Sequence, residues 1–116
     1  MVRILIVDDE APFRRALRLA LRVQGYDIQE ASSGPDALEI LQHDTPDLIL
    51  VDWLMPGMDG LGLCRAIRQG SDVPIILITS RTYGQPEALA AGANDYLRKP
   101  FSVDDLLHHI HSTLDR

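Results

Sequence analysis

The sequence predicts a single doubly wound α/β domain, in which helices cover both faces of a parallel sheet. Short apolar runs alternate with segments whose apolar residues recur at helical spacing, which is typical of repeated βα units. A length of 116 residues and a hydrophobic fraction of 46% suit one domain with its own core. We therefore expect residues 1–116 to fold as one unit.

The predicted strands cover residues 4–7, 27–31, 48–51, 75–78 and 96–97. The first, third and fourth of them are uninterrupted apolar runs, as expected of strands that are buried on both faces.

Helices are predicted between these strands from turn residues and apolar spacing. Pro12 suits the first turn of the first helix, Gly25 its end, and Ser33 precedes the second helix. Residues 86–91 predict only a short fourth helix, and Ser102 caps the last one. The third and last helices are expected to turn these residues inward: Leu61, Cys64, Ile67, Val103, Leu106, Leu107, Ile110 and Leu114.

Charge and composition exclude several classes of protein. The formal charge of −6 argues against nucleic-acid binding by this domain itself. The apolar runs are far too short to cross a membrane, and the N-terminal residues lack a signal pattern. A lone cysteine, Cys64, forms no internal disulfide, so a cytoplasmic location is expected.

Polar side chains follow four of the predicted strands. Carboxylates follow the first and third, hydroxyls the fourth, and the only lysine of the chain the fifth: Asp8, Asp9, Glu10, Asp52, Thr79, Ser80 and Lys99. Because the carboxyl ends of parallel strands meet at one edge of the sheet, we expect a ligand site there.

These residue types suit phosphoryl chemistry. Crowded carboxylates raise one another's pKa unless a cation offsets them, and Mg²⁺ accepts carboxylate and phosphate oxygens. Asp52 is a candidate nucleophile, because a carboxylate is ionised at neutral pH and needs no base. Thr79 and Lys99 are then expected to bind the remaining phosphoryl oxygens.

The chain resembles a response-regulator receiver domain of the chemotaxis-regulator type over essentially its whole length. The resemblance rests on four motifs in order: Ile-Val-Asp-Asp-Glu at 6–10, Val-Asp-Trp-Leu-Met-Pro-Gly-Met-Asp-Gly at 51–60, Thr-Ser at 79–80, and Tyr-Leu-Arg-Lys-Pro-Phe at 96–101. It implies a flavodoxin-like sheet with strand order 2-1-3-4-5.

The resemblance also implies a role for each site residue. Asp52 would accept a phosphoryl group from a phosphohistidine of a sensor kinase or phosphotransfer protein. Mg²⁺ would bind Asp8, Asp9, Asp52 and the Leu54 carbonyl. Lys99 would pair with the acyl phosphate, Thr79 would move toward it, and Tyr96 would swing inward. Residues flanking the site would be Glu10, Leu54, Ser80, Arg81 and Pro100, with a cis bond before Pro100.

Relatives bind effector domains, downstream proteins or a second copy through the face of helix four, strand five and helix five. Here the segment between Thr79 and Lys99 is shorter than usual, and a short, mobile fourth helix is expected. Helix five is therefore expected to carry more of that contact, with His108, His109 and His111 on its exposed polar side. Arg14, Arg18 and Arg22 form a like-charged stripe, which hints at a docking face.

Two other classes of protein with a similar fold do not fit these residues. A haloacid-dehalogenase-type phosphatase needs a second aspartate where Leu54 stands, and a flavodoxin-like cofactor site would be repelled by Asp8, Asp9 and Glu10. A receiver that works as a phosphorylation-independent binding module remains the alternative, although the acidic cluster and Lys99 argue against it.

Overall fold

A computed structural model describes residues 1–115 as five βα units around one parallel sheet. The strands are β1 (Arg3–Val7), β2 (Asp27–Ala31), β3 (Leu48–Asp52), β4 (Ile75–Thr79) and β5 (Asp95–Arg98). The helices are α1 (Ala11–Val23), α2 (Gly34–Leu41), α3 (Gly60–Arg68), α4 (Gln85–Ala90) and α5 (Val103–Leu114). The sheet order is β2-β1-β3-β4-β5, so the predicted order is confirmed.

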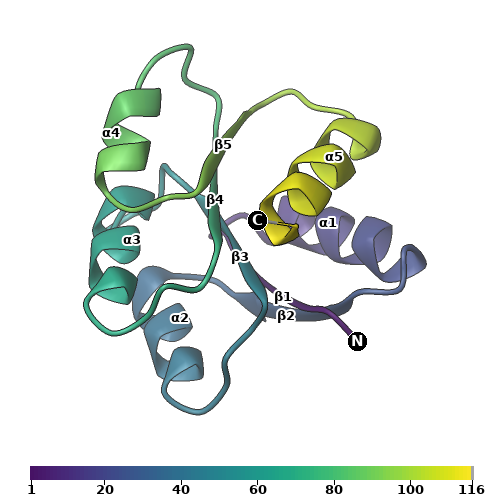
Figure 1. The fold of residues 1–116 in the computed structure, drawn as a ribbon, viewed down its shortest axis with the longest axis horizontal. Helices are drawn as coiled ribbons and strands as arrows, with labels where there is room; N and C mark the ends of the chain where they lie inside the picture. Colours follow the sequence, from purple (N-terminus) through teal and green to yellow (C-terminus); the bar gives the residue numbers. More distant parts are fainter. Residues whose placement is uncertain (116) are drawn as a thin grey trace.

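The helices form two layers, one on each face of the sheet. Helices α1 and α5 cover one face, and α2, α3 and α4 cover the other (Figure 1). The three central strands supply alternate residues to the two cores, because successive side chains of a strand point to opposite faces. One core receives Leu5, Val7, Ile49, Val51, Ile75 and Leu77. The other receives Ile4, Ile6, Leu48, Leu50, Ile76 and Ile78.

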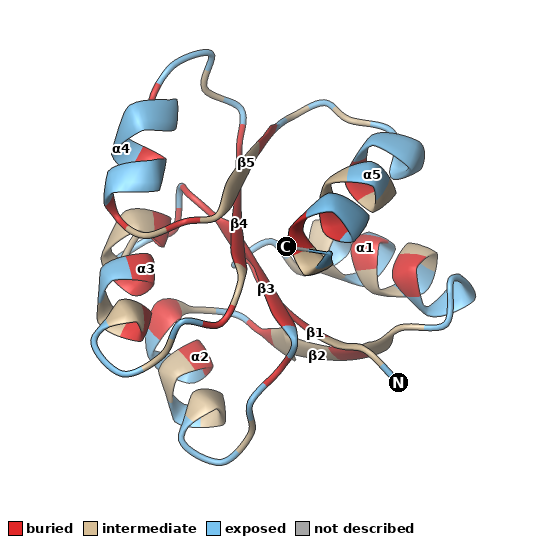
Figure 2. Cartoon of the chain, viewed as in Figure 1, coloured by how far each residue is buried: buried red, intermediate tan, exposed pale blue. Residues whose placement is uncertain are grey.

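Burial follows this layering, with the three central strands buried, the edge strands β2 and β5 mostly half-buried, and the outer sides of the helices exposed (Figure 2). Helix α3 packs Leu61 against the core in a partly buried position, as expected, beside the buried Leu63, Cys64 and Ile67. One expectation for an inward position was wrong. Val103 is 46% exposed, because it is the first residue of α5 and the helix reaches the sheet only from Leu106 onward.

Helix α4 is short, as the sequence predicts. It has six residues, carries Pro86 in its first turn, and buries only Ala88. Among residues 1–115, no helix is both long enough and apolar enough to cross a membrane.

Ser102 caps α5 as predicted and stabilises its first turn. Its hydroxyl accepts a hydrogen bond from the Asp105 amide at 3.0 Å, and its own amide donates to the Asp105 carboxylate at 3.3 Å. Such a capping box satisfies two amides that the helix leaves without partners.

We expect Ser102→Ala to lower the free energy of unfolding by about 1 kcal/mol, because the cap hydrogen bond is lost. Urea unfolding measures this difference. The matched control is Ser112→Ala, an exposed position within α5, for which a much smaller change is expected. Equal losses in the two variants would contradict a capping role.

Candidate functional site

The strand register brings the two buried carboxylates together. Val7 of β1 pairs with Val51 of β3, so the next residues, Asp8 and Asp52, stand side by side at the carboxyl edge of the sheet. Asp8 is 2% exposed and Asp52 is 6% exposed. With the exposed Asp9 they form a cluster in which one carboxylate oxygen of each lies within 4.8 Å of the others.

The crowding and burial of these groups disfavour their charged forms. Burial raises the pKa of the Asp52 carboxyl to about 6; the negative charge of Asp8 adds to this increase, and Lys99 opposes it. Burial also raises the pKa of Asp8, although a hydrogen bond from the Glu10 amide to Asp8 Oδ1, 2.9 Å long, acts against the increase. The cluster therefore stores repulsion that a bound cation would relieve.

Lys99 reaches this edge from the end of β5. Its Nζ lies 3.6 Å from Asp52 Oδ1 and 4.0 Å from the centre of the Phe13 ring on α1. The Lys99 amide donates to the Thr79 carbonyl at 2.7 Å, which ties the two strand ends together. The peptide bond between Lys99 and Pro100 is cis, as the resemblance implied.

Thr79 and Tyr96 are linked through the loop that follows β4. Thr79 is 1% exposed, and its hydroxyl accepts a hydrogen bond from the Arg81 amide at 3.1 Å. The hydroxyl of Tyr96 donates to the Arg81 carbonyl at 2.8 Å and lies 3.3 Å from the Tyr83 carbonyl. One loop residue, Arg81, thus contacts both predicted switch residues.

Trp53, the residue after Asp52, lies beneath the same loop. It is 2% exposed and packs edge to face against Tyr96, with ring centroids 6.2 Å apart. The Arg81 guanidinium lies 4.8 Å from the centre of the Trp53 ring. Gly84 adopts a φ of +106°, and a Cβ there would meet Trp53 at 2.5 Å, so this close approach requires glycine.

The remaining flanking residues border the cluster at the surface. Leu54 is 54% exposed, and Glu10, Ser80 and Pro100 are also exposed. The structure thus brings Asp8, Asp9, Asp52, Thr79 and Lys99 to one edge of the sheet.

Two surface expectations were wrong. The stripe on α1 is not a free docking face, because Arg14 and Arg18 both pair with Glu30 of β2, and only Arg22 is exposed. His109 is not on an exposed polar face: its Nδ1 lies 2.6 Å from Asp95 Oδ2 on β5, whereas His108 and His111 are exposed. Both errors have the same cause, since the acidic partners lie on strands distant in sequence.

The donor set of the cluster fits Mg²⁺. It offers only oxygen atoms, two of the three carboxylates are buried, and burial raises the pKa of both Asp8 and Asp52, so that a bound cation would favour their ionised forms. A hard divalent cation prefers such ligands.

A parallel sheet of this order, with an acidic cluster facing a lysine at its carboxyl edge, defines the class of receiver domains. The chain matches the response regulator receiver domain family over residues 4–111 and belongs to that family. It is thus a receiver domain of two-component systems, a signalling class rather than a conventional class of enzymes.

Curated relatives and solved structures agree with this assignment. The probable transcriptional regulator ycf27 of Porphyridium aerugineum is 43% identical over 98% of this chain and 48% of its own length. The response regulator MprA of Mycolicibacterium vanbaalenii is 42% identical over 99% of this chain and 51% of its own length. The chain therefore spans about half the length of these curated relatives.

Solved structures superimpose over nearly the whole chain. The chemotaxis protein CheY4 of Vibrio cholerae is 32% identical with a TM-score of 0.93, covering 97% of this chain and 98% of its own. The receiver domain of the Francisella response regulator 1452 is 30% identical with a TM-score of 0.92, and the match covers 100% of this chain and 98% of that structure's chain.

The raised pKa of Asp52 predicts a pH-dependent stability. A carboxyl whose pKa is higher in the folded state binds its proton more tightly there, so its contribution to stability is present below about pH 4 and is lost as the pH rises through about 6. Without Mg²⁺, Asp52→Asn is therefore expected to be more stable than the wild type at pH 7.5, by up to about 3 kcal/mol, and nearly equal to it at pH 4.

Urea unfolding in EDTA at the two pH values measures this effect. The control is Asp72→Asn at an exposed position, for which no such pH-dependent gain is expected. A stability difference between Asp52→Asn and the wild type that is the same at both pH values would contradict the assigned repulsion.

Proposed function

We propose that this chain is a phosphorylation-dependent switch and that Asp52 is its phosphoacceptor. The observation that carries this proposal is the position of Asp52: a buried carboxylate beside Asp8 and 3.6 Å from the ammonium of Lys99. The donor is a phosphohistidine of a sensor histidine kinase or a histidine phosphotransfer protein.

In the proposed reaction, one Asp52 oxygen forms a bond to phosphorus while the bond from phosphorus to the histidine nitrogen breaks. The bonding electron pair leaves with the imidazole, and an acyl phosphate remains on Asp52. Lys99 would pair with the transferred phosphoryl group, and Thr79 would donate a hydrogen bond to it. The chain thus assists its own phosphorylation.

Mg²⁺ is the proposed cofactor. Asp8, Asp9, Asp52 and the Leu54 carbonyl would hold it, and when bound it supplies positive charge against the repulsion between the acidic cluster and an anionic donor. Leu54 and Arg81 flank the site and are proposed to tune slow loss of the phosphate, with Glu10, Ser80 and Pro100 beside them.

The hydrogen bonds of the loop support a switch through Thr79 and Tyr96. A Thr79 hydroxyl that turns toward a phosphoryl oxygen gives up the bond from the Arg81 amide, and the carbonyl of Arg81 is the acceptor of Tyr96. A change at the phosphate therefore reaches the face formed by α4, β5 and α5.

That face is the proposed output surface of a receiver unit comprising residues 1–116. Its partner is an effector domain, a downstream protein or a second copy of this chain, and the greater length of the curated relatives supports a linked effector. Exposed groups on α4 and α5 include Leu89, His108 and His111.

Asp52→Asn is expected to abolish phosphate incorporation from a small acyl phosphate donor in the presence of Mg²⁺, because the amide is not a nucleophile. Mass spectrometry of the intact protein measures the incorporation, with Asp72→Asn as a control that keeps the acceptor. Substantial labelling of Asp52→Asn would overturn the assignment of the acceptor, whereas a wild type that takes up no phosphate would favour a phosphorylation-independent binding module.

Asp9→Ala is expected to weaken Mg²⁺ binding at least about tenfold, equivalent to about 1.4 kcal/mol, and to stop phosphorylation. Asp9 is exposed, so little change in folding is expected. A Mg²⁺ titration followed by Trp53 fluorescence and a labelling assay test the two effects. Undiminished labelling of the wild type in EDTA would contradict the role of the metal.

Thr79→Ala is expected to leave phosphorylation of Asp52 possible but to remove its effect on partner binding, since the hydroxyl that responds to the phosphate is lost. Affinity for a partner or for a second copy is measured with and without the phosphodonor. An equal phosphate-dependent gain in the variant and the wild type would refute this coupling.

A further inference from the structure

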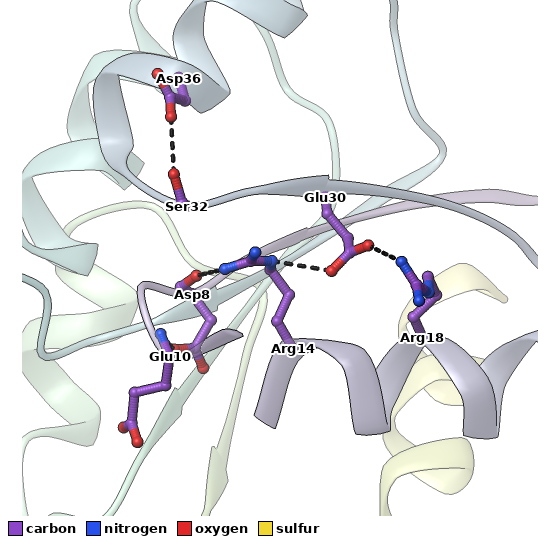
Figure 3. Close-up of polar contacts among 7 residues, drawn as sticks. All are labelled: Asp8, Glu10, Arg14, Arg18, Glu30, Ser32 and Asp36. Atoms are coloured by element: carbon purple, nitrogen blue, oxygen red, sulfur yellow. Dashed lines mark hydrogen bonds and ion pairs between the residues drawn. The ribbon is translucent and has the colours of Figure 1, made fainter. Parts of the chain in front are cut away.

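We propose that Arg14 is a positioning residue for the cation site and that it acts on the main chain of Asp8. This inference rests on the proposed binding of Mg²⁺ to the acidic cluster. Figure 3 shows Arg14 between Asp8 and Glu30, with Arg18 on the far side of Glu30.

The guanidinium of Arg14 joins the end of β1 to β2. Its Nη1 donates to the carbonyl oxygen of Asp8 at 2.7 Å, and its Nε donates to Glu30 Oε1 at 2.9 Å. The amide of Asp8 donates to the Ala31 carbonyl of β2 at 3.1 Å. The main chain of Asp8 is therefore tied on both sides, at its amide and at its carbonyl.

Glu30 fixes the orientation of Arg14. Its second carboxylate oxygen accepts a hydrogen bond from Arg18 Nη1, so the carboxylate is held between two arginines (Figure 3). Burial alone would raise the pKa of Glu30, but the hydrogen bonds and charges of Arg18 and Arg14 outweigh it and lower that pKa. The side chains of Arg14 and Glu30 are only 15% and 21% exposed.

The bridge from Glu30 through Arg14 to the Asp8 carbonyl restrains the position of Asp8, which the mutual repulsion of the acidic cluster does not. Repulsion between Asp8 and Asp52 favours movement of Asp8 away from the site, and strand pairing with β3 ends one residue earlier, at Val7. The bond from Arg14 restrains Asp8 through its main-chain carbonyl, so Arg14 does not compete with a cation for the carboxylate oxygens of Asp8.

A purely electrostatic role and a positioning role of Arg14 predict opposite changes in Mg²⁺ affinity when Arg14 is replaced, so the two roles can be distinguished. If Arg14 acted only through its positive charge, its removal would tighten Mg²⁺ binding, because a repelling cation is lost. If Arg14 positions Asp8, its removal weakens binding instead. Arg18→Gln is the matched control, since it also removes one charge beside Glu30 but does not remove a group that contacts Asp8.

The experiment is a Mg²⁺ titration of the wild type, Arg14→Gln and Arg18→Gln, followed by the fluorescence of Trp53, the only tryptophan. We expect about a tenfold weaker affinity for Arg14→Gln, the size of effect typical of residues that orient metal ligands, and an equal or tighter affinity for Arg18→Gln. Amide hydrogen exchange at residues 8–10, measured without metal, is expected to be faster in Arg14→Gln only.

The outcomes distinguish this inference from the proposed function. A wild type that binds no Mg²⁺ overturns the proposed cofactor. If the wild type binds Mg²⁺ and the Arg14→Gln variant binds it equally or more tightly, only the positioning role of Arg14 is overturned. If Arg14→Gln does not fold, Arg14→Met, which keeps the aliphatic stem in place, is measured with the same criteria.

Discussion

The site depends on two buried carboxylates, Asp8 and Asp52, that the sheet holds side by side. The pairing of β1 with β3 sets Asp8 beside Asp52, and neither carboxylate has enough exposed surface for water to screen the other. Lys99 from β5 and the Glu10 amide, which donates to Asp8, offset part of this repulsion. The negative charge of Asp9 adds to it, and the three carboxylates together form a group that could hold a metal ion. The fold thus holds Asp8 and Asp52 in mutual repulsion, and a bound cation would reduce that repulsion.

Much of the fold and the centre of the site could be predicted from the sequence. Apolar runs predict buried strands, and residues that directly follow such strands must meet at one edge of a parallel sheet. Asp8, Asp52, Thr79 and Lys99 are therefore placed by their positions next to strands. Local signals also sufficed for the cap at Ser102 and for the short helix α4, because both depend on residues within one or two helical turns.

Contacts between charged residues that are distant in sequence could not be predicted in this way. Glu30 and Asp95 occupy polar positions on the two edge strands, and their partners Arg14 and His109 lie on helices whose rotation about their axes the sequence leaves open. The aromatic contact between Trp53 and Tyr96 is similar, since it depends on how the loop after β4 folds over the sheet. One signal was present: Arg14 and Arg18 share a helix face, and a shared counter-ion explains such spacing.

The small buried surface of α4 has a consequence for how this protein can evolve. Of its six residues only Ala88 belongs to the core, and the other five side chains are exposed. Exposed substitutions usually change stability by less than about 0.5 kcal/mol. Selection can therefore change the exposed surface of α4 without endangering folding or the acidic edge of the sheet, which gives duplicated copies of such a domain a route to different surfaces.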